Sequence, residues 1–292
     1  EIRVSDFVKF FEAPIDWYFN KVLGIKYDGD EDDTLPDTEL FDLDHLQKWK
    51  IKTELLKHKD ISEDALKPFT IERIQKGQLP LRNLGRATVE GLLKDIDLVK
   101  HQYHELTEGK EAKSASIDLS VNGLRITGTI DGIFDGEYIH VSTSSSGSIE
   151  KYKVRACLNA LLLYASGEIK AARLLGLKKV NSNITLVNEP YISIDQEIAM
   201  QKLSELVEFF VKGKEQPLVF SLSAAKPPGK EKPITIESVV DALKKETKDR
   251  TYVDPPIPAN KYILKLMDEG YFDNLTEENI EDIRTLAGLL NL

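Results

Sequence analysis

Two turn dipeptides, Asn122-Gly123 and Asp135-Gly136, constrain the fold of this chain more than any other feature of its sequence. Both suit the positive φ angles of a type I′ turn, and each lies between runs rich in Ile, Val, Thr and Tyr. The flanking runs are 115–121, 124–134 and 137–143. We therefore expect three consecutive antiparallel strands, followed by a helix that begins near Ile149.

Hydrophobic periodicity predicts that the chain is helical before this hairpin unit and contains both helices and a strand after it. Further elements are expected as helices over 45–58, 62–76, 85–104 and 195–211 and as a strand at 184–187. In the first 27 residues, apolar side chains recur at helical spacing, Ser5 is the expected N-cap and Pro14 interrupts the helix. Asp44 is the expected N-cap of the helix that follows.

Composition is typical of a globular protein. With 292 residues, of which 41% are hydrophobic, the chain can bury the core of one large domain or two small ones. It has no run of 18 apolar residues and no secretory leader, so we expect a cytoplasmic protein without membrane contact. Cys157 is the single cysteine, which excludes an internal disulfide and an all-cysteine metal site and predicts a core position. Because Glu1 already belongs to a helix motif, we expect a fragment of a longer protein.

The formal net charge of -10 is distributed unevenly along the chain. Residues 28–44 hold nine carboxylates and no Lys or Arg, which predicts a solvated acidic loop whose spacing does not fit a calcium loop. By contrast, 151–180 holds seven basic residues and one acidic residue. Lys and Arg supply phosphate contacts, so this segment is the best candidate nucleic-acid surface, unless its cations are solvated or pair with the acidic loop. The candidate nucleic-acid-binding residues are Lys151, Lys153, Arg155, Lys170 and Arg173.

The hairpin unit contains the motif Ile130-Asp131-Gly132 and resembles the PD-(D/E)xK nuclease fold in its RecB form. Members of that family read G-h-h-D on the first hairpin strand, D-h-K on the second, Q-x-x-x-Y on the helix and G-x-x-x-H upstream. The positions of this chain that match those functional residues are Val89, Asp131, Val141, Thr143, Ala160 and Tyr164. Only the first aspartate and the tyrosine are retained, so the resemblance implies a degenerate nuclease fold.

Other motifs resemble the RecC family, the gamma subunits of exodeoxyribonuclease V. They are the aromatic opening helix with Pro14, the G-x-L-P-x(4)-G motif that begins at Gly77, and the P-L-V-F run at 217–220. In the AddB relatives, a cysteine that ligates an iron–sulfur cluster precedes the proline. Ala13 takes that place here, so the resemblance implies that the cluster is absent, and we expect no cofactor.

The retained residues are too few for metal-dependent phosphodiester hydrolysis. Mg²⁺ prefers several oxygen ligands, usually two or more carboxylates, and a nearby lysine stabilises charge that develops on the phosphate. Val141 and Thr143 supply neither group, so we expect no nuclease activity. Without a ligand role, Asp131 is expected to be a strand-end carboxylate bonded to backbone amides. The alternative, an active metal-dependent nuclease with migrated catalytic residues, would use Asp131, Glu137, Glu150 and Lys153.

The resemblance implies an α+β fold with a restriction-endonuclease-like core, a small mixed sheet flanked by helices. The expected division is a nuclease-like domain at 1–222, with a helical portion at 1–105 and a sheet core at 113–187, and a C-terminal helical extension at 223–292. By resemblance, the chain is a non-catalytic DNA-channel and subunit-assembly domain of a RecBCD-type helicase–nuclease that processes double-strand DNA breaks in recombinational repair. Its implied partners are RecB-like and RecD-like subunits and single DNA strands at a fork, and we expect exposed apolar patches that partners cover. A protein-interaction module of unrelated role is a third interpretation, which composition leaves open.

Overall fold

The computed structural model describes residues 1–27, 43–144, 149–180, 183–227, 229, 232–251 and 257–291. Most of the segment expected as an acidic loop lies outside the described residues, because only Leu43 and Asp44 of its last part are placed. No helix within these ranges has the length and apolar character needed to cross a membrane.

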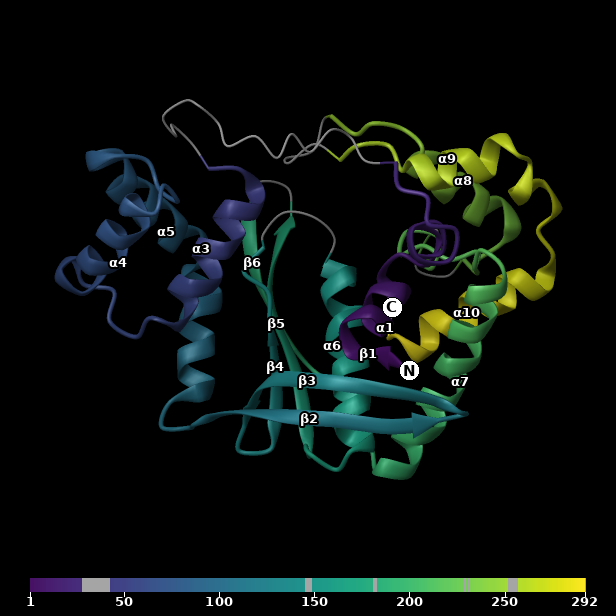
Figure 1. The fold of residues 1–292 in the computed structure, drawn as a ribbon, viewed down its shortest axis with the longest axis horizontal. Coiled ribbons are helices and arrows are strands. Elements are labelled where there is room, and N and C mark those ends of the chain that lie inside the picture. The colour runs from purple at the N-terminus through teal and green to yellow at the C-terminus, as the bar shows by residue number, and fades with distance from the viewer. Residues whose placement is uncertain are drawn as a thin grey trace.

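Within the described residues, a six-stranded mixed sheet forms the centre of the molecule and helices pack on both of its faces (Figure 1). The strands are β1 (Ile2–Arg3), β2 (Ala112–Val121), β3 (Leu124–Phe134), β4 (Glu137–Val141), β5 (Ala171–Val180) and β6 (Asn183–Pro190). The order along the sheet is β1-β3-β4-β5-β6, and β2 pairs with β3 outside this path. β1 pairs with β3 and β4 pairs with β5 in parallel, whereas the other neighbours are antiparallel. The expected α+β class with a small mixed sheet is confirmed.

Two-residue turns connect the first three long strands. Asn122 and Gly123 have φ angles of 48° and 79°, and Asp135 and Gly136 have φ angles of 50° and 80°. Both central residues of each turn are thus left-handed, as a type I′ turn requires. The three antiparallel strands are confirmed, although β4 ends at Val141, earlier than the sequence indicated.

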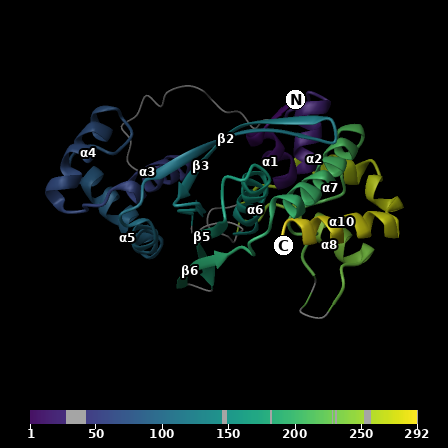
Figure 2. The same ribbon diagram turned by 90° about the horizontal axis from the view of Figure 1, so that it is seen from below.

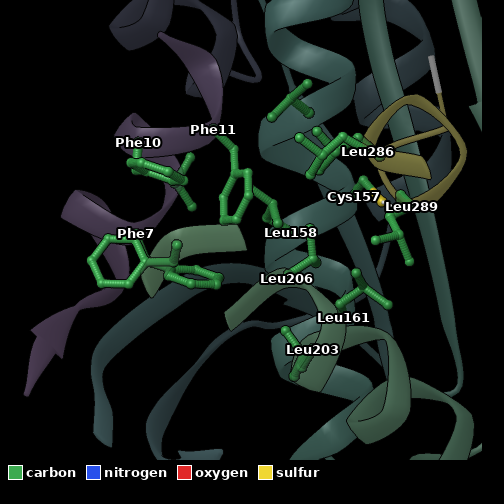
Figure 3. Packing of buried hydrophobic residues seen from close by; sticks show 14 of the residues in the cluster. Phe7, Phe10, Phe11, Cys157, Leu158, Leu161, Leu203, Leu206, Leu286 and Leu289 are labelled. Atoms are coloured by element: carbon green, nitrogen blue, oxygen red, sulfur yellow. Dashed lines mark hydrogen bonds between the residues drawn. The ribbon is translucent and has the colours of Figure 1, made fainter. Parts of the chain in front are cut away.

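Helix α6 (Ile149–Ala165) connects β4 to the parallel strand β5 and is buried on nearly all sides. Helices α1 (Val4–Glu12) and α7 (Gln196–Glu215) pack against it on one face of the sheet. Figure 3 shows this packing, with Phe11 of α1 beside Leu158 of α6. Cys157 is buried in the same set of residues, which we call the first core cluster, so its expected core position is confirmed.

Further short helices from both ends of the chain enclose the first core cluster. They are α2 (Pro14–Trp17), a π-helical turn η1 (Tyr18–Val22), α8 (Ile236–Glu246), α9 (Lys261–Asp268), a 3-10 turn η2 (Tyr271–Asn274) and α10 (Glu277–Leu289). Ile283 and Leu286 of α10 are fully buried in the same cluster as Phe7 of α1. The last helices are therefore part of the main core on this side of the sheet.

On the other side of the sheet, α3 (His45–Lys57), α4 (Glu63–Gln75) and α5 (Arg82–Thr107) form a helical lobe (Figures 1 and 2). Its apolar side chains meet Phe134, Ile139 and Leu175 of the sheet in a second core cluster. Tyr138 and Ile139, successive residues of β4, belong to the first and second cluster respectively, as expected from the alternation of a pleated strand. The three predicted helices are confirmed, and Asp44 caps α3 within a capping box.

The expected N-cap at Ser5 is wrong. Ile2 and Arg3 pair in parallel with Ile126 and Thr127 of β3, which holds the backbone extended up to Arg3. The helix therefore begins at the next residue, and Arg3 occupies the N-cap position without a side-chain hydrogen bond. The expected interruption at Pro14 is confirmed, because α1 ends before it and α2 begins at it.

Candidate functional site

Asp131, the carboxylate retained from the nuclease motif, is exposed on β3. Within the described residues it makes no hydrogen bond or ion pair, so the expected bonds to backbone amides are not found. The strand is irregular at this point, because the register with β2 shifts between Lys113 and Ser114, next to the aspartate. Gly132 follows with a φ of 93°, and a Cβ there would lie 3.1 Å from the carbonyl oxygen of Ile139. Asp131 is thus a carboxylate on a distorted strand, with no hydrogen bond or ion pair to any described residue.

Three other motif positions lie in apolar or neutral surroundings. Val141 ends β4 and packs against the second core cluster. Val89 of α5, which stands in place of the family's histidine, is 2% exposed in the same cluster. Thr143, in place of the lysine, is 2% exposed, and its Oγ1 has no hydrogen-bond partner in the described part of the chain. None of these side chains can supply a carboxylate or a cation.

Ala160 and Tyr164 of α6 belong to the first core cluster, on the opposite side of the sheet from Val89. They line a cavity of about 280 Å³ between α6, the end of β6 and the end of α10. Its polar lining includes Lys153 and Glu189, which form an ion pair. The sheet therefore separates the degenerate positions into two groups, and they do not converge on one cavity.

Apart from Asp131, the charged groups available to a nuclease with migrated residues are held in ion pairs with other elements. The pairs, with their N–O distances, are Glu137–Arg173 (2.8 Å), Glu150–Lys226 (2.7 Å) and Lys153–Glu189 (2.9 Å). Across the described ranges, no three His, Cys, Asp or Glu side chains are grouped so that they could hold a metal ion. In the described part of the chain, Asp131 is therefore not part of a cluster of three possible metal ligands.

The five candidate nucleic-acid-binding residues do not form one continuous surface. Lys151, Lys153 and Arg155 lie in the first two turns of α6, whereas Lys170 lies beyond its other end, just before β5. At 1.5 Å per residue, the helix rises about 15 Å between Arg155 and its last residue, Ala165, so Lys170 lies near the end of α6 opposite to the three cations. Lys170 is exposed and makes no ion pair with any described residue.

The other four cations are paired with acidic side chains. Arg155 donates from Nε and an Nη to the two oxygens of Glu12, at 2.8 and 3.1 Å, and the Glu12 side chain is only 6% exposed. Lys151 approaches the same carboxylate at 3.8 Å, and Arg173 also donates to Asn188. The partners found are thus in α1, β4 and β6. The pairing with residues 28–42 that the sequence left open lies outside the described residues.

A polar chain that the sequence motifs do not reveal lies between β4 and α6. Asn159 Nδ2 donates to Tyr138 Oη at 2.8 Å, and Tyr138 Oη lies 3.0 Å from His140 Nδ1. Since the tyrosine oxygen accepts from Asn159, its own hydrogen can be donated to Nδ1, which leaves the imidazole hydrogen on Nε2. Nε2 is buried without a partner among the described residues. Burial, together with the charge of Arg155, lowers the pKa of His140 to about 3, so the imidazole is neutral at pH 7.

Two sequence features could have indicated this chain of hydrogen bonds. Tyr138 and His140 are two residues apart on a strand, so their side chains lie on the same face. Asn159 is the one amide side chain in the otherwise apolar run 156–165. Because a buried amide needs hydrogen-bond partners, a polar contact between this helix and a strand was predictable, but not which strand.

Comparison with known proteins identifies relatives for most of the chain. A family model described as RecC C-terminal domain matches residues 1–227. The RecBCD enzyme subunit RecC of Haemophilus influenzae is 25% identical over 219 residues, which are 72% of this chain and 18% of that protein. The RecBCD enzyme subunit RecC of Buchnera aphidicola is 24% identical over 225 residues, which are 77% of this chain and 20% of that protein. The chain thus spans about a fifth of the length of these curated relatives.

A solved structure also aligns with this chain. It is the crystal structure of a protein assigned as an exonuclease, from Eubacterium rectale. The alignment has a TM-score of 0.40 at 12% sequence identity, and it covers 73% of this chain and 80% of that chain.

Proposed function

The chain belongs to the RecC C-terminal domain family, and from this membership we propose that it is a non-catalytic domain of a RecBCD-type helicase–nuclease. In that role it holds subunits together and borders the path of the separated strands when the complex processes double-strand DNA breaks. The relatives that support the proposal are named as subunits of the RecBCD enzyme. Its partners are accordingly RecB-like and RecD-like subunits and single-stranded DNA.

The observation that carries the non-catalytic part is the environment of the nuclease motif positions. Val89 and Val141 contribute to a packed apolar cluster, and Thr143 is buried and uncharged. Asp131 is left as an exposed carboxylate that belongs to no group of three possible metal-ligating side chains among the described residues. A two-carboxylate metal site with an adjacent cation, which phosphodiester hydrolysis by Mg²⁺ requires, has no counterpart among these side chains.

The assembly part is supported by the apolar surface of the helical lobe. Large side chains of this lobe and its connections, each between 41% and 59% exposed, are Leu46, Trp49, Ile61, Ile71, Leu81, Leu84 and Leu98. Single exposed apolar residues are ordinary, but a concentration of them on one lobe is typical of a surface that a partner covers. These residues are candidates for the exposed apolar patches expected from the sequence.

The proposed contact with DNA rests on the cations that are not already neutralised by carboxylates. Lys170 has no ion pair in the described chain, and Lys151, whose side chain is 53% exposed, has only a long contact of 3.8 Å. Lys153, Arg155 and Arg173 are already neutralised by neighbouring carboxylates. With a net charge of -10, the chain binds DNA only weakly, in a salt-sensitive way and without sequence preference.

Reconstitution of the whole complex tests the proposed function. The full-length protein that contains this chain is purified with its RecB-like and RecD-like partners, with and without the substitution Asp131→Ala. We expect the three subunits to copurify and both complexes to unwind and degrade DNA at the same rate. Loss of DNA degradation in the assembled variant contradicts the non-catalytic role, and failure of the unaltered subunits to copurify contradicts the assembly role.

A further inference from the structure

The helical lobe contains a groove of about 470 Å³ between α4 and α5. Its floor is apolar and is formed by Leu66, Ile71 and Ile74 of α4 and by Val89 and Leu93 of α5. Leu66 and Val89 are buried, whereas Ile71 is 45% exposed. The groove is thus an extension of the second core cluster that opens to solvent, and burying it further would release water from apolar surface.

The charges at the rim of the groove are only partly balanced. Arg86 of α5 lies 2.6 Å from Glu63 of α4 and 2.9 Å from Glu90, so one cation lies between two carboxylates in a local network with a net charge of -1. Lys67 and Arg82 also line the groove, both are exposed, and neither makes an ion pair with a described residue. The lining thus holds three cations and two carboxylates, and the two cations without an ion pair, Lys67 and Arg82, complement a partner that carries carboxylates.

The shape of the groove fits a helix. The residues that α4 contributes run from Glu63 to Ile74, which at 1.5 Å per residue corresponds to a length of about 16 Å, or about three helical turns. A helix that lies between two others can bury apolar residues spaced by three and four against such a floor. Its flanking positions then face the cations of the rim.

The described chain does not provide this helix. Both termini lie near α1 and α10, at the other end of the molecule from α4 (Figure 1). No described segment covers the groove, which lies at the far end of the molecule from α1 and α10 (Figure 2). An occupant of the groove therefore comes from outside the described residues.

We propose that the α4–α5 groove binds an amphipathic helix of another subunit, with apolar residues spaced by three and four and Asp or Glu along one edge. The inference rests on the assembly role proposed above and assigns that role to one surface. Ile71 and Leu93 contact the apolar face of the incoming helix, and Lys67 and Arg82 contact its carboxylates.

Photocrosslinking within the reconstituted complex tests the identity of the occupant. Benzoylphenylalanine replaces Ile71 in the full-length protein, and, as a control, Ile198 of α7, which is 43% exposed on the other side of the sheet. After irradiation, mass spectrometry identifies the crosslinked peptides. The groove is supported if position 71, but not position 198, crosslinks to an apolar helical segment with an acidic edge in another subunit. The proposal is overturned if position 71 crosslinks to the protein's own chain or to DNA. It is also overturned if position 71 forms no crosslink in a complex that has assembled.

Subunit affinity provides the second test. Ile71→Asp places a charge on the groove floor and is expected to weaken subunit association about tenfold or more, whereas Ile198→Asp leaves it unchanged. The double variant Lys67→Glu/Arg82→Glu, which alters only exposed side chains, is expected to weaken association by a smaller factor that shrinks at high salt. If the unaltered complex assembles and these groove variants assemble equally well, the groove inference fails while the assembly role stands. If the unaltered subunits do not associate, the proposed function itself fails.

Discussion

Gly85 in the first turn of α5 explains why the spacing of the G-x-L-P-x(4)-G motif matters. A Cβ at this position would lie 2.4 Å from the carbonyl oxygen of Pro80 and 2.9 Å from Cδ1 of Ile74. Gly77 begins the turn with a φ of 66°, and Leu79 is 1% exposed beneath it. The motif is therefore a tight connection that packs α5 against the end of α4 and shapes one end of the groove.

Two glycine substitutions in α5 are expected to change stability in opposite directions. Gly85→Ala should lower the free energy of unfolding by about 1 to 3 kcal/mol, because the added methyl group collides with backbone that cannot move without disturbing the turn. Gly91→Ala should raise it by about 0.5 to 1 kcal/mol, because nothing lies within 4 Å of the added carbon and alanine favours the helix. Urea unfolding of both variants measures the difference. Equal effects would show that α5 does not approach Pro80 as described.

His140 predicts a pH dependence of stability. Its pKa is about 3 in the folded protein, against about 6.5 for an unperturbed imidazole. Between these pH values the unfolded chain binds a proton that the folded chain does not. The contribution of His140 to the free energy of unfolding is therefore fully present above pH 6.5 and is lost as the pH falls toward 3. The expected loss is about 1.4 kcal/mol per pH unit once the unfolded imidazole is fully protonated.

The variant His140→Gln isolates this effect. Between pH 6 and pH 5 we expect it to lose about 1 kcal/mol less of its free energy of unfolding than the unaltered protein does. Other groups, including Asp16, whose pKa burial raises, titrate in both proteins and cancel in the comparison. Exposed His101 supplies the control, and His101→Gln should keep the full pH dependence. An unchanged pH dependence in His140→Gln would show that His140 can be protonated in the folded state.

At the scale of elements, α6 combines features that the sequence predicts with others that it does not. Its start at Ile149 and the core position of Cys157 follow from local patterning. The partner of Arg155 does not, because Glu12 lies 143 positions away in the sequence. Local charge counts over 151–180 show an excess of cations, but only the fold brings a buried glutamate of α1 beside them.

Charge reversal in α6 is expected to affect stability more than DNA binding. Replacing Lys151, Lys153 and Arg155 by Glu leaves Glu12 buried among like charges, which should cost about 3 kcal/mol or more. Of the three, only Lys151 is free enough to contact phosphate. The slope of log affinity against log salt for a single-stranded oligonucleotide should therefore fall by no more than about 0.7, the share of one phosphate contact.

Fluorescence anisotropy over a salt series, with circular dichroism to confirm folding, measures both effects. The single variant Lys151→Glu gives the slope if the triple variant does not fold. A fall of about 2 in the slope of a folded triple variant would contradict the ion pairing and restore the whole segment as a DNA surface.

Other elements show where prediction from sequence ends. The two hairpins were predictable because Asn122-Gly123 and Asp135-Gly136 act locally on the backbone. The start of α1 was not, because the pairing of Ile2 and Arg3 with β3 is a contact between distant residues, and such pairing overrides a favourable cap at Ser5.

At the scale of the whole molecule, the sheet separates two cores, and the nuclease motif positions are divided between them. Val89 and Val141 lie with the helical lobe, whereas Ala160 and Tyr164 lie with α1 and α7. That Val89, Val141, Thr143 and Ala160 differ from the residues of the nuclease motif can be read directly from the sequence. Their division between two faces cannot, since it depends on how α5 and α6 pack on opposite sides of one sheet (Figure 2). Among the described residues, the motif positions therefore share no common cavity, and no three side chains are grouped as metal ligands.

Cleavage of DNA by the purified chain tests the non-catalytic role most directly. Linear single-stranded and double-stranded DNA are incubated with the chain in Mg²⁺ or Mn²⁺, beside the variant Asp131→Ala and the variant Asp97→Ala, which removes an exposed carboxylate of α5. We predict that all three proteins leave the DNA intact in either metal. Metal-dependent cleavage that Asp131→Ala abolishes and Asp97→Ala preserves would contradict the account and identify Asp131 as part of an active nuclease site.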